Sequence, residues 1–320
     1  MTGCTSTSPI VGNSPAIQRA RDLIGRYATT KLPILVMGAT GTGKELVAQH
    51  IHSLSGRPGP LVDVNCGALP RDMVESLLFG HRRGSFTGAV ESVPGYVERA
   101  NGRTLFLDEL SHLPVEGQVK LLRVLETGEL ERLGEASKRA VDLRVVAAVQ
   151  DDLAERLRSQ AFRRDLFQRL AGVVIVLPPL RDRMDDVAVL ARHFARLEGR
   201  NLEEGCRHVL ANHGWPGNVR ELRLAIERAG QLVENGTVPP SALAESIQLG
   251  LPDEGGGPSS DRPAALDAGL PSARQRMLRL CAEHDWDYRL IAAAMCVGKS
   301  TLYRRLSRLG ISLRGGGISH

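Results

Sequence analysis

The stretch Ile34–Glu45, ILVMGATGTGKE, decides the fold, because its composition changes three times within twelve residues. Its first four residues form an unbroken apolar run, which is typical of a strand buried on both faces of a parallel sheet. The glycines that follow let the backbone turn tightly and direct consecutive N–H groups inward. Lys44 then opens a predicted helix, KELVAQHIHSL, whose N-terminal dipole favours an anion. The stretch is therefore predicted to cradle a phosphate.

The glycine and lysine spacing in this stretch matches the P-loop, in which four residues separate a glycine from a Gly-Lys pair. Glu45 stands where that motif usually has a serine or threonine whose hydroxyl binds magnesium. A glycine turn between an ordinary strand and helix is the alternative, and the strand and helix on either side argue against it. The predicted binding residues are Gly38, Ala39, Thr40, Gly41, Thr42, Gly43, Lys44 and Glu45.

Composition restricts the class of protein. The chain has 320 residues, enough for about two domains, and 42% of them are hydrophobic, as in an ordinary globular protein. It contains no run of 18 apolar residues and does not begin like a secretion signal, so we expect a cytoplasmic protein without a membrane span. The five cysteines form no CxxC pair, which argues against a disulfide framework or a zinc site.

The positive charge of the chain is concentrated near its end. Residues 271–314 carry nine basic and three acidic side chains, a local charge of +6, whereas the whole chain has a net charge of +5. The basic excess therefore lies wholly in this segment. A polyanionic partner is expected to bind there.

Apolar runs alternate with helical patterns over the first part of the chain. A helical pattern over residues 15–30 leads into the P-loop strand. Further strands are predicted at residues 61–65, 104–109, 143–149 and 173–180. Strands that alternate with helices indicate an α/β fold with a parallel sheet and helices on both faces.

The rest of the chain predicts smaller parts. From Asp185 to about Leu249 the pattern is helical only, broken at residues 214–218, which indicates a small helical subdomain. Residues 252–263 are rich in Gly, Pro and Ser and indicate a linker. The predicted divisions are a leader (1–9), an α/β subdomain (10–183), a helical subdomain (184–250), a linker (251–270), a small all-α domain (271–314) and a tail (315–320).

TLFLDEL, residues 104–110, predicts a buried strand that ends in two acids. Doubly wound sheets bind ligands at the C-terminal edge of their strands. Asp108 is expected to hold Mg²⁺, directly or through water, and Glu109 to polarise an attacking water. A solvated strand end is the alternative, and the P-loop that precedes this strand by about 65 residues favours the functional interpretation.

Eight motifs, taken in order, resemble the AAA+ domain of bacterial enhancer-binding proteins, the sigma-54-dependent transcriptional activators. They are GATGTGKE (38–45), VNCGAL (64–69), LFGHRRGSFTGA (78–89), GYVERANGRTLFLDE (95–109), LLRVLETGELERLG (121–134), FRRDLFQRL (162–170), LPPLRDR (177–183) and WPGNVREL (215–222). The resemblance covers residues from about 10 to 240. It implies an AAA+ P-loop NTPase with a helical lid that binds ATP and Mg²⁺, hydrolyses ATP and assembles into a homo- or hetero-oligomeric ring. Glutamate commonly follows the P-loop lysine in that family, in agreement with Glu45.

One of these motifs resembles the loop with which the family contacts sigma-54, normally GAFTGA. Here the loop is Gly84, Ser85, Phe86, Thr87, Gly88 and Ala89, with serine in place of the first alanine. An apolar and hydroxyl tip between glycines suits a mobile loop whose reach changes with the nucleotide state. An ordinary glycine-rich surface turn is the alternative.

The resemblance also implies roles for residues that respond to the nucleotide. Arg163 and Arg169 match the arginine fingers, which act on the nucleotide of a neighbouring subunit and stabilise charge on its γ-phosphoryl group. Arg220 matches the sensor II arginine of the lid. Asn65 matches the residue that turns the catalytic Glu109 away from water by a hydrogen bond. For each single arginine, a surface salt bridge is the alternative.

Within the AAA+ region, four residues besides Ser85 depart from the family's pattern. Val149 and Gln150 stand where the sensor I strand often ends in threonine and asparagine. Arg103 replaces a common glycine and Leu224 a common asparagine. None of these departures removes a catalytic group, and slower hydrolysis is compatible with them.

DYRLIAAAM and KSTLYRRLSRLGI, joined by CVG, indicate two amphipathic helices and a short turn. They resemble the Fis-like helix-turn-helix that ends most enhancer-binding proteins, with Cys296 in place of the usual glycine of the turn. A solvated basic helix is the alternative. The side chains expected to bind double-stranded enhancer DNA are Lys299, Ser300, Thr301, Tyr303, Arg304, Arg305 and Arg308.

These features predict a sigma-54-dependent transcriptional activator that binds enhancer DNA and hydrolyses ATP to remodel the RNA polymerase holoenzyme into the open complex. An AAA+ unfoldase or helicase loader would not need GSFTGA or a terminal helix-turn-helix. A DNA-binding regulator with a decayed ATPase would be expected to lose the sigma-54 loop. Because the resemblance begins by about Ile10, we expect no N-terminal sensory domain. We therefore expect the activity to be controlled by a regulatory protein in trans, in preference to control by the abundance of the protein or by an internal site.

Overall fold

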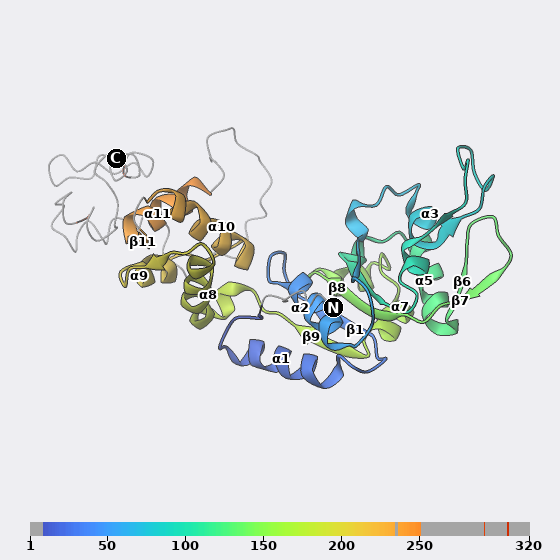
Figure 1. Cartoon of the computed structure of the whole chain (residues 1–320), viewed down its shortest axis with the longest axis horizontal. Coiled ribbons are helices and arrows are strands. Elements are labelled where there is room, and N and C mark those ends of the chain that lie inside the picture. The colour runs from blue at the N-terminus through green and yellow to red at the C-terminus, as the bar shows by residue number, and fades with distance from the viewer. Residues whose placement is uncertain (1–8, 234–235, 251–290, 292–305, 307–320) are drawn as a thin grey trace. The chain divides into compact units, whose positions relative to one another are not determined.

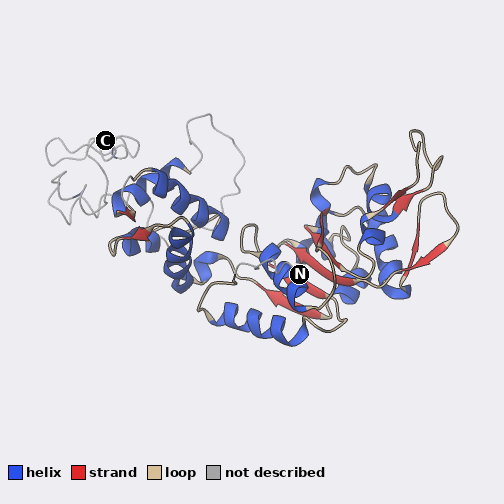
Figure 2. Cartoon of the chain, viewed as in Figure 1, coloured by secondary structure: helices blue, strands red, loops and turns tan. Residues whose placement is uncertain are grey.

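The computed structural model describes residues 9–233 and 236–250, together with Ile291 and Leu306. The described residues divide into two compact units (Figure 1). The first unit contains residues 9–193 and 213–223, and the second contains residues 194–212, 224–233 and 236–250. Figure 2 shows that the long strands all belong to the first unit and that helices dominate the second.

A five-stranded parallel sheet organises the first unit. Its strands are β1 (Ile34–Met37), β2 (Val62–Asn65), β5 (Thr104–Asp108), β8 (Arg144–Val149) and β9 (Val173–Val176). They are arranged in the order β2-β5-β8-β1-β9, and each neighbouring pair is parallel. The strand that leads into the P-loop and the strand that ends in the two acids are therefore separated by β8, which pairs with both.

Alternating side chains of the three inner strands, β1, β5 and β8, enter two separate hydrophobic cores, one on each face of the sheet, whereas the edge strands β2 and β9 each contribute to one core. Phe106 and Val146 pack with α1 (Pro15–Tyr27) and α2 (Lys44–Leu54). The opposite face packs with α3 (Val74–Phe79), α5 (Val115–Thr127) and α7 (Arg164–Leu170). The first unit is thus a three-layer α/β/α arrangement, in which α1 lies along β9 (Figure 1).

Short elements complete the first unit. β3 pairs with β4 and β6 pairs with β7, both antiparallel. The bounds are η1 (Cys66–Ala68), β3 (Gly80–His81), β4 (Val93–Pro94), α4 (Tyr96–Arg99), η2 (Leu110–His112), β6 (Glu129–Glu131), β7 (Lys138–Ala140), α6 (Leu153–Arg158) and η3 (Leu180–Asp182).

Two helices, α8 (Met184–Leu197) and α10 (Asn218–Gln231), begin in the first unit and end in the second. The second unit also contains α9 (Cys206–Ala211) and α11 (Pro240–Leu249), which pack against each other. A parallel pair of two-residue strands, β10 (Asn201–Leu202) and β11 (Thr237–Val238), lies beside them. Among the described residues, no helix is both long and apolar enough to cross a membrane.

The structure confirms the predicted strands and the helix after the P-loop, and it corrects two details. The strand predicted over residues 173–180 ends at Val176, because Pro178 and Pro179 follow and lack the N–H that would extend the ladder. The prediction of helices alone after Asp185 is wrong, since β10 and β11 lie in that region. Strands of two residues are too short to leave a periodic pattern in the sequence.

The buried centre of the sheet generates a stability prediction with a matched control. Val146 in the central strand β8 is fully buried, whereas Val174 in the edge strand β9 is 36% exposed. We expect Val146→Ala to lower the free energy of unfolding by about 2 kcal/mol, because it removes two methyl groups and leaves a cavity.

The same substitution at Val174 is expected to cost less than about 1 kcal/mol, because water already reaches that side chain. Urea unfolding followed by circular dichroism measures both values. Equal losses for the two variants would contradict the burial described here.

Candidate functional site

The P-loop forms a tight turn between β1 and α2 at the C-terminal edge of the sheet. Gly41 and Gly43 have φ angles of +79° and +106°, a region that favours glycine. A Cβ on Gly41 would lie only 2.4 Å from the carbonyl oxygen of Gly217, so a side chain there would collide with the backbone. The start of the loop is joined to β8 by a hydrogen bond from the Gly38 N–H to the Val149 carbonyl, 3.2 Å long.

Lys44 is the first residue of α2, and its side chain folds back over the loop. The ammonium group donates hydrogen bonds to the carbonyl oxygens of Gly38, at 2.7 Å, and Ala39, at 3.0 Å. Burial lowers the pKa of Lys44, and the negative charges of Asp108, Asp151 and Glu109 partly oppose this effect. A buried ammonium beside a glycine turn and a helix N-terminus is suited to bind a phosphate group.

The two acids lie at the end of β5, two strands away from the P-loop strand. The register pairs Asp108 with Asn65 on β2, so both side chains sit at the same edge of the sheet. Asp108 Oδ1 accepts a hydrogen bond from the Glu109 N–H at 2.9 Å. Glu109 has a φ angle of +50°, a left-handed conformation that is uncommon for residues other than glycine and is concentrated at functional sites.

The Glu109 carboxylate contacts a different amide from the one that we expected. Gln150 Nε2 donates to Glu109 Oε1 at 3.3 Å. Asn65 Oδ1 instead accepts from the Ala68 N–H at 3.0 Å and caps η1. Gly67 lies so close that a Cβ there would be 2.4 Å from Glu109 Oε2. In the sequence Gln150 stands out only as a departure from the family's pattern. It contacts Glu109 because β8 lies directly beside β5.

Arg220 lies in the first turn of α10, next to the P-loop. Its backbone N–H donates to the Gly41 carbonyl at 3.3 Å, and its positive charge contributes to the lowered pKa of Lys44. Arg220 therefore lies in the same site as Lys44, Asp108 and Glu109.

The two other predicted arginines do not contact this site within the described subunit. Arg163 pairs with Asp165 at 2.7 Å, just before α7. Arg169 lies in α7 and donates to the Leu125 carbonyl of α5 at 2.7 Å. Since α7 covers the face of the sheet opposite α2, neither arginine is positioned to act on a phosphate bound by its own P-loop.

The GSFTGA loop lies between β3 and β4. It is closed by hydrogen bonds from the Gly84 N–H to the Ala89 carbonyl and from the Ala89 N–H to the Phe86 carbonyl. The ring of Phe86 meets the ring of His81 edge-on, with centroids 5.1 Å apart, yet the residue remains 42% exposed. Phe86 and Thr87 are thus accessible to a partner. The predicted DNA-binding residues, Lys299, Ser300, Thr301, Tyr303, Arg304, Arg305 and Arg308, lie outside the described residues.

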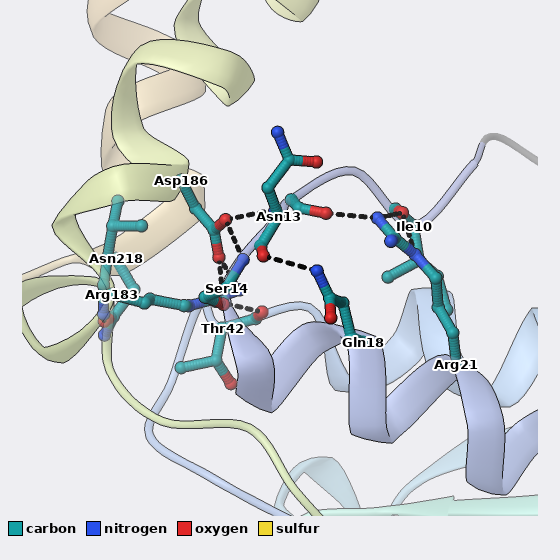
Figure 3. A network of polar contacts seen from close by, with 11 residues as sticks. Ile10, Asn13, Ser14, Gln18, Arg21, Thr42, Arg183, Asp186 and Asn218 are labelled. Carbon is teal, nitrogen blue, oxygen red and sulfur yellow. Dashed lines mark hydrogen bonds and ion pairs between the residues drawn. The ribbon is translucent and has the colours of Figure 1, made fainter.

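A buried polar network joins the segment before α1 to the start of α8 (Figure 3). Asp186 is fully buried and accepts hydrogen bonds from the N–H groups of Asn13 and Ser14 and from the Ser14 hydroxyl. Arg183, 3.9 Å from Asp186, donates to the Thr42 carbonyl of the P-loop at 3.1 Å. No local pattern in the sequence predicts this network, although Arg183 is the last residue of the LPPLRDR motif.

A P-loop on a parallel sheet, with two acids at the end of a strand two positions away and an arginine at the start of α10 beside the loop, defines a P-loop nucleotide-binding protein. Residues 10–176 match the Sigma-54 interaction domain family, and residues 181–257 match the AAA+ ATPase lid domain. The chain belongs to the family of sigma-54-dependent transcriptional activators, and it has the AAA+ P-loop NTPase fold with a parallel sheet and a helical lid.

Individual relatives agree with this assignment. The chain is 40% identical over 317 residues to the C4-dicarboxylate transport transcriptional regulatory protein DctD of Rhizobium meliloti, covering 95% of this chain and 65% of DctD. It is 39% identical over 316 residues to the anaerobic nitric oxide reductase transcription regulator NorR of Enterobacter sp., covering 94% of this chain and 63% of NorR. The chain thus spans just under two thirds of the length of these relatives.

A solved structure of NtrX from Brucella abortus in complex with ATP is similar to this chain. The TM-score is 0.69 with 31% sequence identity, over 95% of this chain and 70% of NtrX. The RuvB P216G mutant of Thermotoga maritima, at 16% identity and a TM-score of 0.53, shares the fold.

Cys66 provides a chemical probe of the acid cluster. It is 2% exposed, and burial, followed by the charges of Asp108, Glu109 and Asp63, raises the pKa of its thiol to about 12. At pH 8.5 the native thiol should therefore react with iodoacetamide roughly two to three orders of magnitude more slowly than the thiol of the unfolded chain, because the thiolate is the reactive form.

Mass spectrometry of the peptide that contains Cys66 measures the reaction, with the same chain in urea as the control. Asp108→Asn should accelerate labelling in the native state, since it removes a negative charge that disfavours the thiolate. Native labelling as fast as in urea would contradict this description of the site.

Proposed function

We propose that the protein hydrolyses ATP and uses the energy to activate transcription by the sigma-54 RNA polymerase holoenzyme. The observation that supports this most is the convergence of Lys44, Arg220, Asp108 and Glu109 on one P-loop. In this proposal the P-loop N–H groups and Lys44 bind the phosphates of ATP, and Arg220 reports on the γ-phosphate.

Glu109 is the general base of the proposed reaction, because its carboxylate lies at the strand edge where the γ-phosphate of ATP would be bound. Its partner Gln150 and the nearby Asn65 are candidates for orienting it. The donor set fits a magnesium ion, since Asp108 offers a carboxylate oxygen and Mg²⁺ is usually held by one or two carboxylates together with substrate phosphates. When bound, Mg²⁺ would neutralise charge on those phosphates.

Arg163 and Arg169 are proposed to act as arginine fingers between subunits of a ring. Their positions on the far side of the sheet from α2 support an action in trans. In this proposal each ring subunit completes its neighbour's active site, so an isolated subunit would be a poor ATPase.

The Gly84–Ala89 loop is proposed to contact sigma-54. Residues 271–314 are proposed to bind enhancer DNA, and the protein is proposed to act in the cytoplasm. The exposure of Phe86 and Thr87 supports the first proposal, and the local charge of +6 supports the second. DctD and NorR are named as transcription regulators, which agrees with both. The predicted domain boundaries and regulation by a protein in trans stay predictions.

The ATPase proposal is tested at two residues with different roles. Lys44→Ala is expected to weaken ATP binding at least tenfold, whereas Glu109→Gln should retain binding and lower kcat by about 10² to 10⁴. Lys31→Ala is the matched control, because Lys31 is a surface lysine whose side chain is 85% exposed. Steady-state phosphate release and equilibrium nucleotide binding give the two values.

Wild-type activity no higher than that of Lys44→Ala would refute the proposed ATPase. Because the arginine fingers come from a neighbouring subunit, specific activity should also rise with protein concentration. A flat profile across the range in which the ring assembles would remove the roles proposed for Arg163 and Arg169.

The role proposed for the Gly84–Ala89 loop predicts that ATP hydrolysis and transcription activation can be separated by substitution. Phe86→Ala and Thr87→Ala are expected to leave ATPase activity within about twofold of wild type and to abolish ATP-dependent open-complex formation at a sigma-54 promoter, since this loop would contact the partner and not the phosphate. Val90→Ala is the control, because Val90 is 73% exposed but lies just outside the hexapeptide. Full open-complex formation by both loop variants would show that the loop has another role.

A further inference from the structure

Backbone carbonyl oxygens of the P-loop accept hydrogen bonds from residues that are far away in the sequence. Asn218 Nδ2 donates to the Thr40 carbonyl at 2.9 Å, and the Val219 N–H donates to the Gly41 carbonyl at 3.0 Å. Arg183 donates to the Thr42 carbonyl, as Figure 3 shows. Three successive carbonyls of the loop are therefore directed towards the segments that begin α8 and α10.

This arrangement determines where the N–H groups of the loop point. In a trans peptide, the C=O of one residue and the N–H of the next point in opposite directions. Because the Thr40 and Thr42 carbonyls face Asn218 and Arg183, the N–H groups of Gly41 and Gly43 face the other way. Among the described residues, none accepts a hydrogen bond from these two N–H groups. They are available to an anion.

Asn218 is itself held in a single orientation. It is 3% exposed, and its φ angle of +56° is one that asparagine tolerates better than most residues. Its Oδ1 accepts from the Leu180 N–H at 2.7 Å, which requires that the amide NH₂ faces the Thr40 carbonyl. One side chain thus bridges two backbone segments and directs a donor at the P-loop.

We propose that Asn218 is a positioning residue for nucleotide binding: its amide holds the Thr40 carbonyl outward, so that the Gly41 N–H is presented to the phosphates. The inference rests on the proposed function, because it assumes that the P-loop binds a nucleotide. In this proposal Asn218 contributes to nucleotide affinity without touching the nucleotide. It does so through a hydrogen bond to a residue 178 positions away in the chain.

Two substitutions separate this role from a structural one. Asn218→Asp keeps the acceptor for the Leu180 N–H and tolerates the same backbone conformation, but it replaces the donor to Thr40 with an acceptor. Asn218→Gly also tolerates a positive φ and removes the donor without adding a charge, although it removes the acceptor for the Leu180 N–H as well. Asn101→Asp is the matched control, because the exposed Asn101 accepts from the Asp142 N–H just before β5 begins, at the opposite end of the strands from the P-loop.

The experiment measures the Kd of the full chain for a fluorescent ADP analogue, kcat at saturating ATP and the Tm without nucleotide. Asn218→Gly is expected to raise the Kd about threefold to tenfold, the effect of losing the hydrogen bond to Thr40, and Asn218→Asp at least as much. For Asn218→Asp, kcat should stay within about twofold of wild type. Its Tm is expected to fall below that of Asn101→Asp, because the new carboxylate is buried at position 218 and exposed at position 101, so the test depends on a higher Kd at an unchanged kcat.

The remaining outcomes would overturn the proposal. Wild-type affinity in both Asn218 variants would show that the Thr40 contact does not matter for binding. A loss of affinity in Asn218→Asp alone would indicate repulsion by the new charge. A loss of nucleotide affinity accompanied by a comparable fall in kcat would indicate a general distortion of the site, and hence a structural role. If the wild-type chain does not bind the analogue, the proposed function itself fails, and that result is distinct from the other three.

Discussion

Hydrogen bonding of the P-loop carbonyls is the constraint on which the rest of this structure depends. A glycine-rich turn presents its N–H groups to a phosphate only when its C=O groups are satisfied elsewhere. Lys44 satisfies the first carbonyls of the loop, and Asn218, Val219 and Arg183 satisfy the next ones. The start of α8 and the start of α10 accordingly belong to the same compact unit as the sheet. The phosphate cradle therefore depends on residues that lie 141 and 178 positions away in the chain.

The order of the strands places the positive and negative groups of the site close together. Because β8 lies between β1 and β5, the end of β8 faces the P-loop on one side and the acids on the other. Gly38 is joined to Val149, and Gln150 contacts the Glu109 carboxylate. Burial lowers the pKa of Lys44, while the nearby carboxylates stabilise its charge. A buried cation and the two acids at the end of β5 are thus held at the same edge of the sheet.

Much of the sheet and of the site could be predicted because the signals are local. The apolar run before the P-loop, the glycine spacing and the helix that opens at Lys44 all lie within about twenty residues, and the structure begins α2 at that lysine. The acid pair was found because it directly follows an apolar run. β10 and β11 were missed because two-residue strands have no period, and the partner of Glu109 was missed because strand order is not written in any one segment.

The sequence by itself determined the P-loop, the strands and helices of the α/β unit and the identity of the charged groups, since spacing and periodicity act over a few residues. Only the tertiary structure decided which distant groups meet. Gln150 reaches Glu109 because β8 is inserted between two other strands, and Asn218 reaches Thr40 because α10 begins beside the P-loop. Such contacts depend on topology and on left-handed turns such as those at Glu109 and Asn218, and no local pattern encodes either of them.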